Sequence, residues 1–521
     1  MTTQAQEFPA APPVVEPSHE WGRLDPRMVI VRPLNEMLGL LIPVFAFVFL
    51  GNGEPWRLGL SGAAVGSLFL YGLFAWLTTK YRISDTQVEL HKGLLHRQRL
   101  AIPRDRIRTV DLTSKLGHRL FGLTAVRVGT GQQERSPGEG VVLDAVTAAE
   151  ADRLRQVFLH RRASTDTTEP ADLPADEGTP ISTLDRRWYR YAPLSMSGLV
   201  TIGIAVGFGM NIANELDLEF SQVGVIRSVF TWVTESSPPV VAPAVVGVVL
   251  VVSVALSFVT YLLQNHGFHL NRHADGTVRV RRGLLTTRSV SVEEQRLRGV
   301  TLHEPLLLRA GRGGRLTAVT TGLGRTSGSG LLLPPAPRSE ADRVSAEVLR
   351  TTTAATAVAL TRHPARARTR RLVRALAPNL VLVGALLLLA LLAHWPNWPW
   401  ITAAGLLPVS VLIGLDRYRN LGHALTDRYL VSRSGSLDRE TVALQRTGII
   451  GWKFTQTVFQ RRADLLTVTA ITAAGKGGYP VVDIGESAGL TLADTAIPDL
   501  LRPFLSRSDP PPQPAVPAGG R

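Results

Sequence analysis

Long uninterrupted apolar runs set the pattern of this sequence. A helix needs about 20 mostly apolar residues to cross about 30 Å of hydrocarbon. Two of the connections between runs, 51–57 and 395–398, are too short to hold more than a hairpin turn. The pattern therefore predicts an integral membrane α-helical protein with six transmembrane helices as three hairpins, at 33–50, 58–79, 192–213, 240–263, 376–394 and 398–415.

Basic residues mark one side of the predicted membrane. Lys80 and Arg82 follow the first hairpin, Arg272 follows the second and Arg417 follows the third. The loops inside the hairpins are mainly acidic instead. Because Lys and Arg collect on the cytoplasmic side of membrane proteins, we expect the N-terminus, the C-terminus and all large polar segments to be cytoplasmic.

A polar module repeats after each hairpin. Setting Gly93, Gly283 and Gly435 in register aligns the following residues without a gap. Apolar positions then coincide at Leu100, Val290 and Val442, and again at Val110, Val300 and Trp452. Alternation with a period of two predicts strands around both positions, and a strand hairpin precedes each glycine.

Each copy is expected to close with a helix. The pattern resembles a capping box, in which a hydroxyl side chain precedes an acid by three residues. It occurs at Thr147 and Glu150, at Ser339 and Asp342, and at Thr491 and Asp494. The predicted order is a disordered N-terminal tail 1–32, hairpin 33–79, module 80–162, acidic linker 163–187, hairpin 188–265, module 266–351, polybasic linker 352–375, hairpin 376–415, module 416–506 and a disordered C-terminal tail 507–521.

Composition supports a membrane protein and excludes several chemistries. The 521 residues are 45% hydrophobic and only 19% charged, with 57 Lys and Arg against 42 Asp and Glu. The absence of cysteine excludes disulfides, zinc-thiolate sites, iron–sulfur clusters and thiol nucleophiles. The net positive charge attracts phosphate, but no nucleic-acid-binding motif accompanies it, so we expect no nucleic acid partner.

Two motifs match patterns of catalysis or metal binding, but their sequence context argues against both functions. Residues 485–489 match the G-x-S-x-G nucleophile motif, but that fold places its histidine after the serine and no histidine follows His423. His266, His269 and His273 have helical spacing, yet the repeat register places them on a strand and its turn, where His266 points away from the others. We therefore predict no catalytic residues, no metal site, no cofactor and no enzyme activity.

Arginines supply the candidate binding residues. One group of six lies directly before the fifth predicted helix, where a polybasic segment binds anionic lipid or simply fixes the topology: Arg362, Arg366, Arg368, Arg370, Arg371 and Arg374. A second group recurs at one register position of the three modules: Arg119, Arg309 and Arg461. The repeated arginine either fixes a carboxylate within the fold or faces lipid phosphate.

The first module resembles a known family. Residues 92–95 (Lys-Gly-Leu-Leu), 102–107 (Ile-Pro-Arg-Asp-Arg-Ile) and 116–122, with Arg119 inside, are similar to the core pattern of the bacterial pleckstrin-homology-like (YdbS/YdbT-type) membrane proteins. Three copies, each after a hairpin, are typical of the larger, three-copy YdbT-like member. The later copies depart from the pattern, with Glu293 in place of Pro103 and Gly448 in place of Arg106. The resemblance implies three cytoplasmic PH-like β-sandwich or barrel modules, each of about seven strands closed by a C-terminal helix, and no known chemistry.

These observations lead to a function without catalysis. We expect a multi-pass protein of the bacterial plasma membrane that acts as a membrane-apposed scaffold or as a protein- or lipid-binding platform. The expected partners are anionic membrane lipids and, by resemblance, a smaller single-PH-module membrane protein. The alternative is a subunit of a transport or lipid-translocating complex, which would carry its substrate between the hairpins.

Overall fold

The protein is described from a computed structural model, which covers residues 21–35, 55–84, 86–93, 97–107, 109–129, 141–159, 178–215, 228, 231–232, 235–321 and 330–501. The chain forms two compact units. The first comprises residues 1–297 and 320–335, and the second comprises 298–319 and 336–521. The boundary runs through the second predicted module, so each unit is considered by itself.

Apolar helices account for most of the predicted hairpins. The described part of the chain contains three helices long and apolar enough to cross a membrane, Pro239–Asn265, Ala365–Leu392 and Trp398–Arg419, and two shorter apolar helices, Val65–Thr78 and Ser197–Gly207. Little of the three long helices is buried, as lipid-facing surfaces require. Most of the first predicted helix, 33–50, lies outside the described residues. Three of the predicted membrane helices are thus confirmed by length and composition, whereas the count of six stays a prediction.

The helix bounds show where these segments begin. In the first unit they are α2 (Pro55–Thr78), α3 (Leu116–Leu120), α4 (Ala148–Leu159), α5 (Ser197–Glu215) and α7 (Pro238–Asn265). In the second they are α8 (Leu306–Ala310), α9 (Arg338–Leu349), α10 (Ala365–Leu392), α11 (Trp398–Gly405), α12 (Leu407–Arg419), α13 (Val458–Arg461), α14 (Glu486–Ala496) and α15 (Pro498–Leu501). The fifth predicted span is thus longer than expected: α10 starts at Ala365 and includes most of the polybasic segment.

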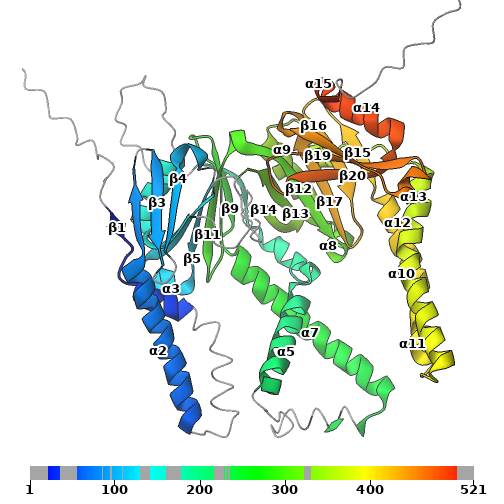
Figure 1. Ribbon diagram of the computed structural model, residues 1–521, viewed down its shortest axis with the longest axis horizontal. Coiled ribbons are helices and arrows are strands. Elements are labelled where there is room, and N and C mark those ends of the chain that lie inside the picture. Colours follow the sequence, from blue (N-terminus) through cyan, green and yellow to red (C-terminus); the bar gives the residue numbers. More distant parts are fainter. Residues whose placement is uncertain are drawn as a thin grey trace, which may run out of the picture. The chain divides into compact units, whose positions relative to one another are not determined.

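The first unit holds two antiparallel sheets (Figure 1). One has the order β1-β2-β3-β4 and the other β7-β6-β5-β11-β10-β9-β8. The strands are β1 (Gly22–Arg23), β2 (Lys80–Ile83), β3 (Gln87–Lys92), β4 (Gln98–Pro103), β5 (Thr109–Ser114), β6 (Leu123–Gly129), β7 (Val141–Thr147), β8 (Thr179–Thr183), β9 (His269–Arg272), β10 (Thr277–Arg282) and β11 (Thr287–Glu293). The second sheet joins β5–β7 of the first module to β9–β11 of the second.

The second unit repeats this connection. Strand β12 pairs with β17, so that β12 of the second module joins the sheet β17-β16-β15 of the third, and β18-β19-β20 form a separate sheet. The strands are β12 (Leu297–Pro305), β13 (Gly313–Thr320), β15 (Gly422–Leu425), β16 (Tyr429–Ser434), β17 (Asp438–Gln445), β18 (Gly451–Thr455), β19 (Leu465–Ile471) and β20 (Gly478–Gly485), while β14 (Leu331–Pro337) crosses the boundary between the units.

The repeat register predicted from sequence has a clear backbone cause. Gly93, Gly283 and Gly435 all have positive φ, at 103°, 109° and 104°. A Cβ at Gly283 would lie 2.0 Å from the carbonyl oxygen of Thr286. The backbone conformation therefore favours glycine at this position in each module, and at Gly283 and Gly435 the lack of space excludes a side chain as well.

Each module packs a closing helix against its strands. Around α4, buried side chains such as Leu154 and Phe158 form one core with Val110 and Leu143. The capping residue Thr147 accepts a hydrogen bond from the Glu150 amide at 3.3 Å, as its spacing predicts. The predicted starts of the other two closing helices are wrong: Ser339 lies inside α9, which begins at Arg338, and Thr491 lies inside α14, which begins at Glu486 directly after β20.

Candidate functional site

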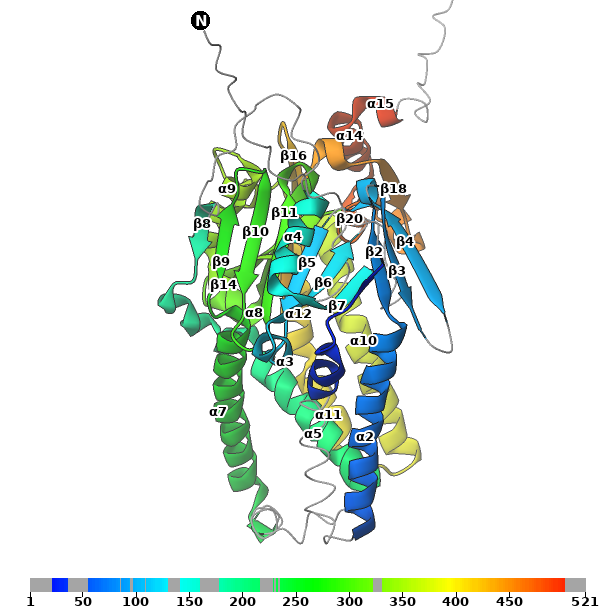
Figure 2. The ribbon, with the colours of Figure 1, turned by 90° about the vertical axis from the view of Figure 1, so that its left-hand side faces the viewer.

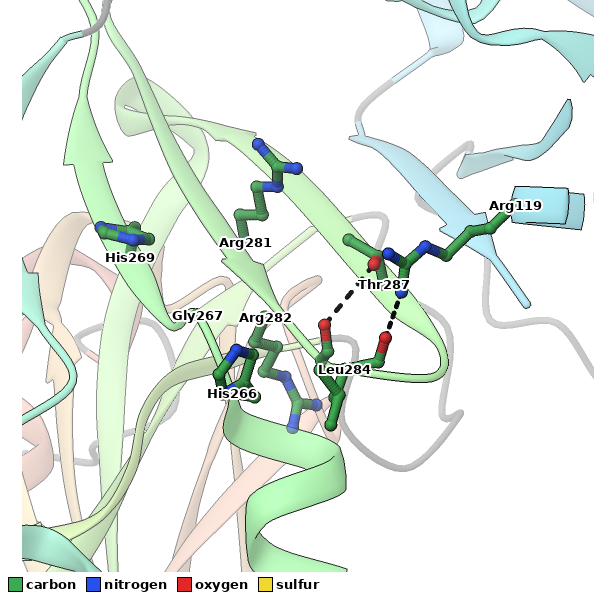
Figure 3. Close-up of a pocket in the computed structure, with 9 residues that line it drawn as sticks. Arg119, His266, Gly267, His269, Arg281, Arg282, Leu284 and Thr287 are labelled. Atoms are coloured by element: carbon green, nitrogen blue, oxygen red, sulfur yellow. Dashed lines mark hydrogen bonds between the residues drawn. The ribbon is translucent and has the colours of Figure 1, made fainter. Parts of the chain in front are cut away.

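A basic pocket lies where helix α7 leaves the predicted membrane. The helix ends at Asn265, and the next residue, His266, is already part of the pocket wall. The cavity has a volume of about 330 Å³. Figure 3 shows the lining residues: Arg119, His266, Gly267, His269, Arg281, Arg282, Gly283, Leu284 and Thr287.

Residues of the turn between β10 and β11 line this basic pocket. The Gly283 amide donates to the carbonyl oxygen of His266 at 2.8 Å, and the Leu284 amide donates to that of Leu263 at 2.8 Å. These two bonds fasten the turn to the last turn of α7. The repeated glycine therefore positions the pocket directly at the end of an apolar helix.

Arg119 reaches the pocket from the first module. It lies on the short helix α3, and its guanidinium donates to the carbonyl oxygen of Leu284 (Figure 3). On the same turn the Thr287 hydroxyl donates to the Gly283 carbonyl oxygen at 3.5 Å. Two modules of the first unit thus contribute to one basic site.

The electrostatics of the pocket favour an anion. Its nine lining residues include three arginines and two histidines and no acidic residue. Arg119 and Arg281 are exposed, while Arg282 is half-buried. Burial lowers the pKa of Arg282 to about 10, with the neighbouring charge of Arg288 adding to this and Asp111 opposing it. Arg282 remains charged at neutral pH, and guanidinium groups match the oxygens of phosphate in geometry.

Some arginines of the predicted polybasic segment form ion pairs with carboxylates of the protein itself. Arg370 and Arg371 both pair with Asp483, which is fully buried in β20. Gln460 donates a further hydrogen bond to the same carboxylate at 2.9 Å. This group of side chains, here called the α10 anchor, attaches the start of α10 to the third module.

The remaining arginines of that segment are more accessible. Arg366 pairs with Asp464, and both side chains are largely exposed. Arg362, Arg368 and Arg374 are exposed and form no ion pair with the described residues. Lipid binding by the six arginines stays a prediction, with three of them engaged elsewhere in the fold.

The repeated arginine acts between modules in the first two copies. Arg119 bonds to Leu284 of the second module, and Arg309 pairs with Asp416 on α12, which leads into the third module, at 3.0 Å. Arg461 is exposed, with no ion pair in the described part of the chain. Of the three repeated arginines, Arg309 alone has a carboxylate partner among the residues that the structure describes, as the first interpretation predicts.

One group of side chains could geometrically hold a cation. His303, Asp438 and Glu440 have ligand atoms within 4.8 Å of one another, and no other described cluster meets this criterion. Lys476 pairs with Glu440 at 2.8 Å. Burial alone would raise the pKa of the Asp438 carboxyl, but the imidazole of His303, 3.6 Å away, and the charges of Arg315 and Lys476 outweigh burial and lower it. These contacts make the group an ion-pair network.

The sequence contains one signal of the basic pocket. Arg281 and Arg282 immediately precede the repeated Gly283, shortly after a predicted span. Arg119, however, is more than 150 positions away, and only the pairing of β5 with β11 brings it to this turn. Of the three histidines considered for a metal site, His266 and His269 line the pocket, whereas His273 is buried just after the end of β9.

Comparison with known proteins agrees with the three-module pattern. A family model described as Bacterial PH domain matches residues 38–162, 218–352 and 373–496. The UPF0699 transmembrane protein YdbT of Bacillus subtilis (strain 168) is 22% identical over 485 residues, which is 89% of this chain and 95% of that protein. No solved structure matches. With three matches that cover more than half of its length, the chain belongs to the bacterial PH domain family.

Proposed function

We propose that this membrane protein binds the phosphate of anionic lipid headgroups in the basic pocket at the end of α7. The observation that carries the proposal is a cavity with three arginines and no acidic lining residue, placed directly after an apolar helix. A headgroup in the plane of the bilayer surface would meet Arg119 and Arg281 there, while its acyl chains stay beside the helix. Binding without catalysis makes the protein a membrane-apposed platform.

Lipid retention tests this proposal. The tagged protein is purified from its native membrane in mild detergent, and bound lipids and proteins are identified by mass spectrometry. We expect retained anionic lipid in the wild type and loss of most of it in Arg119→Gln/Arg281→Gln. Arg428→Gln, at an exposed turn between β15 and β16, is the matched control and should retain lipid. Equal retention in all three proteins would refute the pocket as the binding site.

A protein partner belongs to the same proposal. The family resemblance supports a smaller membrane protein with a single PH-like module, which the same purification would detect as a stoichiometric component. The platform would then present lipid-bound modules to that partner. A preparation that contains lipid but no second protein would leave lipid apposition as the whole function.

The proposal also includes six membrane spans with all modules in the cytoplasm of a bacterial plasma membrane. The distribution of Lys and Arg around the apolar runs supports this orientation. Since the chain has no cysteine, Asp427→Cys at the exposed β15–β16 turn offers a single labelling site. An impermeant maleimide should label it only after the cells are opened. Labelling of intact cells would reverse the orientation.

A further inference from the structure

The two connections between modules have the same register. In the first unit Asp111 of β5 lies opposite Val290 of β11, and in the second unit Thr301 of β12 lies opposite Val442 of β17. Counted from the repeated glycines, Asp111 and Thr301 are both at position 18 of their module. Val290 and Val442 are both at position 7 of the next. Both connections therefore join a module to the next one in the same strand register.

Charged side chains reinforce both connections. Asp111, buried on β5, receives hydrogen bonds from Arg288 of β11. Glu304, buried on β12, lies opposite Arg439 of β17 and receives its hydrogen bonds at 2.8 and 2.9 Å. An arginine on the incoming strand therefore meets a carboxylate in each case.

The third module is the last of the three matched copies, and its corresponding strand is largely exposed. Strand β18 pairs with β19 alone in the described part of the protein. Its Phe454 is 38% exposed, whereas the equivalent Leu112 and Leu302 are 8% and 0% exposed. Arg461, the repeated arginine whose counterparts contact the next module, is exposed as well.

The first module has the complementary open edge. Strand β4 is equivalent to β11 and β17, and among the described residues it pairs only with β3 (Figure 2). Arg97 and the β4 residues Gln98 and Arg99 are exposed. A single chain thus carries both halves of the connection that it makes twice internally, and each half lacks a partner strand among the described residues.

We propose that β18 of one copy pairs antiparallel with β4 of a second copy in the register of the two internal connections. This register sets Lys453 opposite Leu100, Phe454 opposite Arg99 and Gln456 opposite Arg97. The guanidinium of Arg99 would lie against an aromatic ring. The Gln456 amide already donates to Glu486 at 3.2 Å, so a carboxylate is close to the place that Arg97 would occupy.

The partner strand is inferred to come from a second copy of the chain, because the two open edges correspond to the strands that pair in the internal connections. Both edges belong to the same chain, and no like-charged residues stand opposite each other in the inherited register. The interface is heterologous, so the same contact can repeat from copy to copy as a ring or a row. This assembly is independent of the proposed lipid binding, because neither edge includes a residue of the basic pocket.

Cysteine cross-linking in the full-length protein tests the register. Two differently tagged chains, one with Lys453→Cys and one with Leu100→Cys, are co-expressed, and membranes are treated with an oxidant or a short bis-maleimide. Directly opposed Cβ atoms in antiparallel strands lie about 4.5–5.5 Å apart, so we expect a cross-linked dimer that carries both tags. If the chain with Lys453→Cys is replaced by one with Asp427→Cys, at an exposed residue outside β18, the cross-link should disappear.

An internal pair calibrates the experiment. Thr301→Cys and Val442→Cys in one chain occupy the same register position and should cross-link within that chain. If this control reacts while the Lys453 and Leu100 cysteines do not, the proposal is wrong. It is also wrong if those two cysteines react only within one doubly substituted chain, or if the Lys453 cysteine captures a different protein. Lipid retention measured on the same samples reports separately on the proposed function.

Discussion

The α10 anchor and the basic pocket both contain arginines, but only the anchor also contains a carboxylate that neutralises them. Both contain arginines beside an apolar helix, at the start of α10 and at the end of α7. In the anchor, two guanidinium groups share the buried carboxylate of Asp483. The pocket gathers three arginines without an acidic lining residue. The comparison shows that the density of arginines along a sequence is a poor guide to an anion site, because the fold can supply the counter-ion itself.

The largest expected effect comes from removing the counter-ion of the anchor. Asp483→Asn leaves Arg370 and Arg371 without their carboxylate, and breaking a buried ion pair in this way costs about 3–5 kcal/mol. Asparagine tolerates the positive φ of this position, 58°, so backbone strain contributes little. Thermal unfolding in detergent should show a clear fall in the midpoint. An unchanged midpoint would mean that the anchor does not stabilise the second unit.

The next effect concerns the pocket and should leave stability nearly intact. Removing two surface arginines from an anionic headgroup costs about 1 kcal/mol each, so Arg119→Gln/Arg281→Gln should weaken binding about 30-fold. Titration of the reconstituted protein with anionic lipid against zwitterionic lipid measures this affinity. Arg370→Gln, in the anchor, should instead lower stability and leave lipid affinity unchanged. The reverse pattern would exchange the roles of the two regions.

Acid should loosen the anchor by a moderate amount. His363 next to it lies 3.0 Å from His423, nitrogen to nitrogen, and contacts the Asp483 carbonyl oxygen at 3.1 Å. Burial, with a smaller contribution from His363, lowers the pKa of His423 to about 4 from 6.5. Between these values the unfolded chain binds more protons at His423 than the folded one, so the contribution of this residue lowers stability as pH drops from about 6.5 to 4 and is constant above.

The midpoint of thermal unfolding, followed against pH, measures this loss. We expect about 1–2 kcal/mol, reduced by solvent screening of the partly exposed ring. His423→Gln should flatten the profile over the same range. A profile as steep as that of the wild type would assign the acid sensitivity to other groups.

The smallest expected effect comes from the exposed ion pair between Arg366 and Asp464. Asp464→Asn removes the carboxylate that pairs with Arg366, but both side chains are mostly in water. Exposed pairs contribute about 0–1 kcal/mol. The unfolding midpoint should therefore stay within about 2 °C of the wild type, which also makes Asp464→Asn the matched control for Asp483→Asn. A shift as large as that of Asp483→Asn would remove the distinction between buried and exposed pairs.

Local features of the fold followed from the sequence. The turn at Gly283 and its two counterparts, and the strands around Val110 and Val300, lie where the repeat register places them. These positions are set by neighbours in the chain, through backbone conformation and alternating polarity.

Features that depend on distant partners did not follow from the sequence. Asp111 meets Arg288 at a separation of 177 residues, and Arg370 meets Asp483 at 113. The hydrophobic pattern specifies which face of a strand is buried, but it carries no information on which edges pair. The pocket depends on such an edge pairing, so neither its location nor its composition could be predicted.

The shared register between modules has a consequence for the history of the chain. Because each connection joins the same two positions, a tandem duplication or deletion of one hairpin and one module leaves the remaining strands in the same backbone register. Shortening the chain by its middle repeat would set Asp111 of β5 opposite Val442 of β17. A change in the number of modules by whole units thus preserves the backbone register of the connections, while the charged side chains across them must adapt.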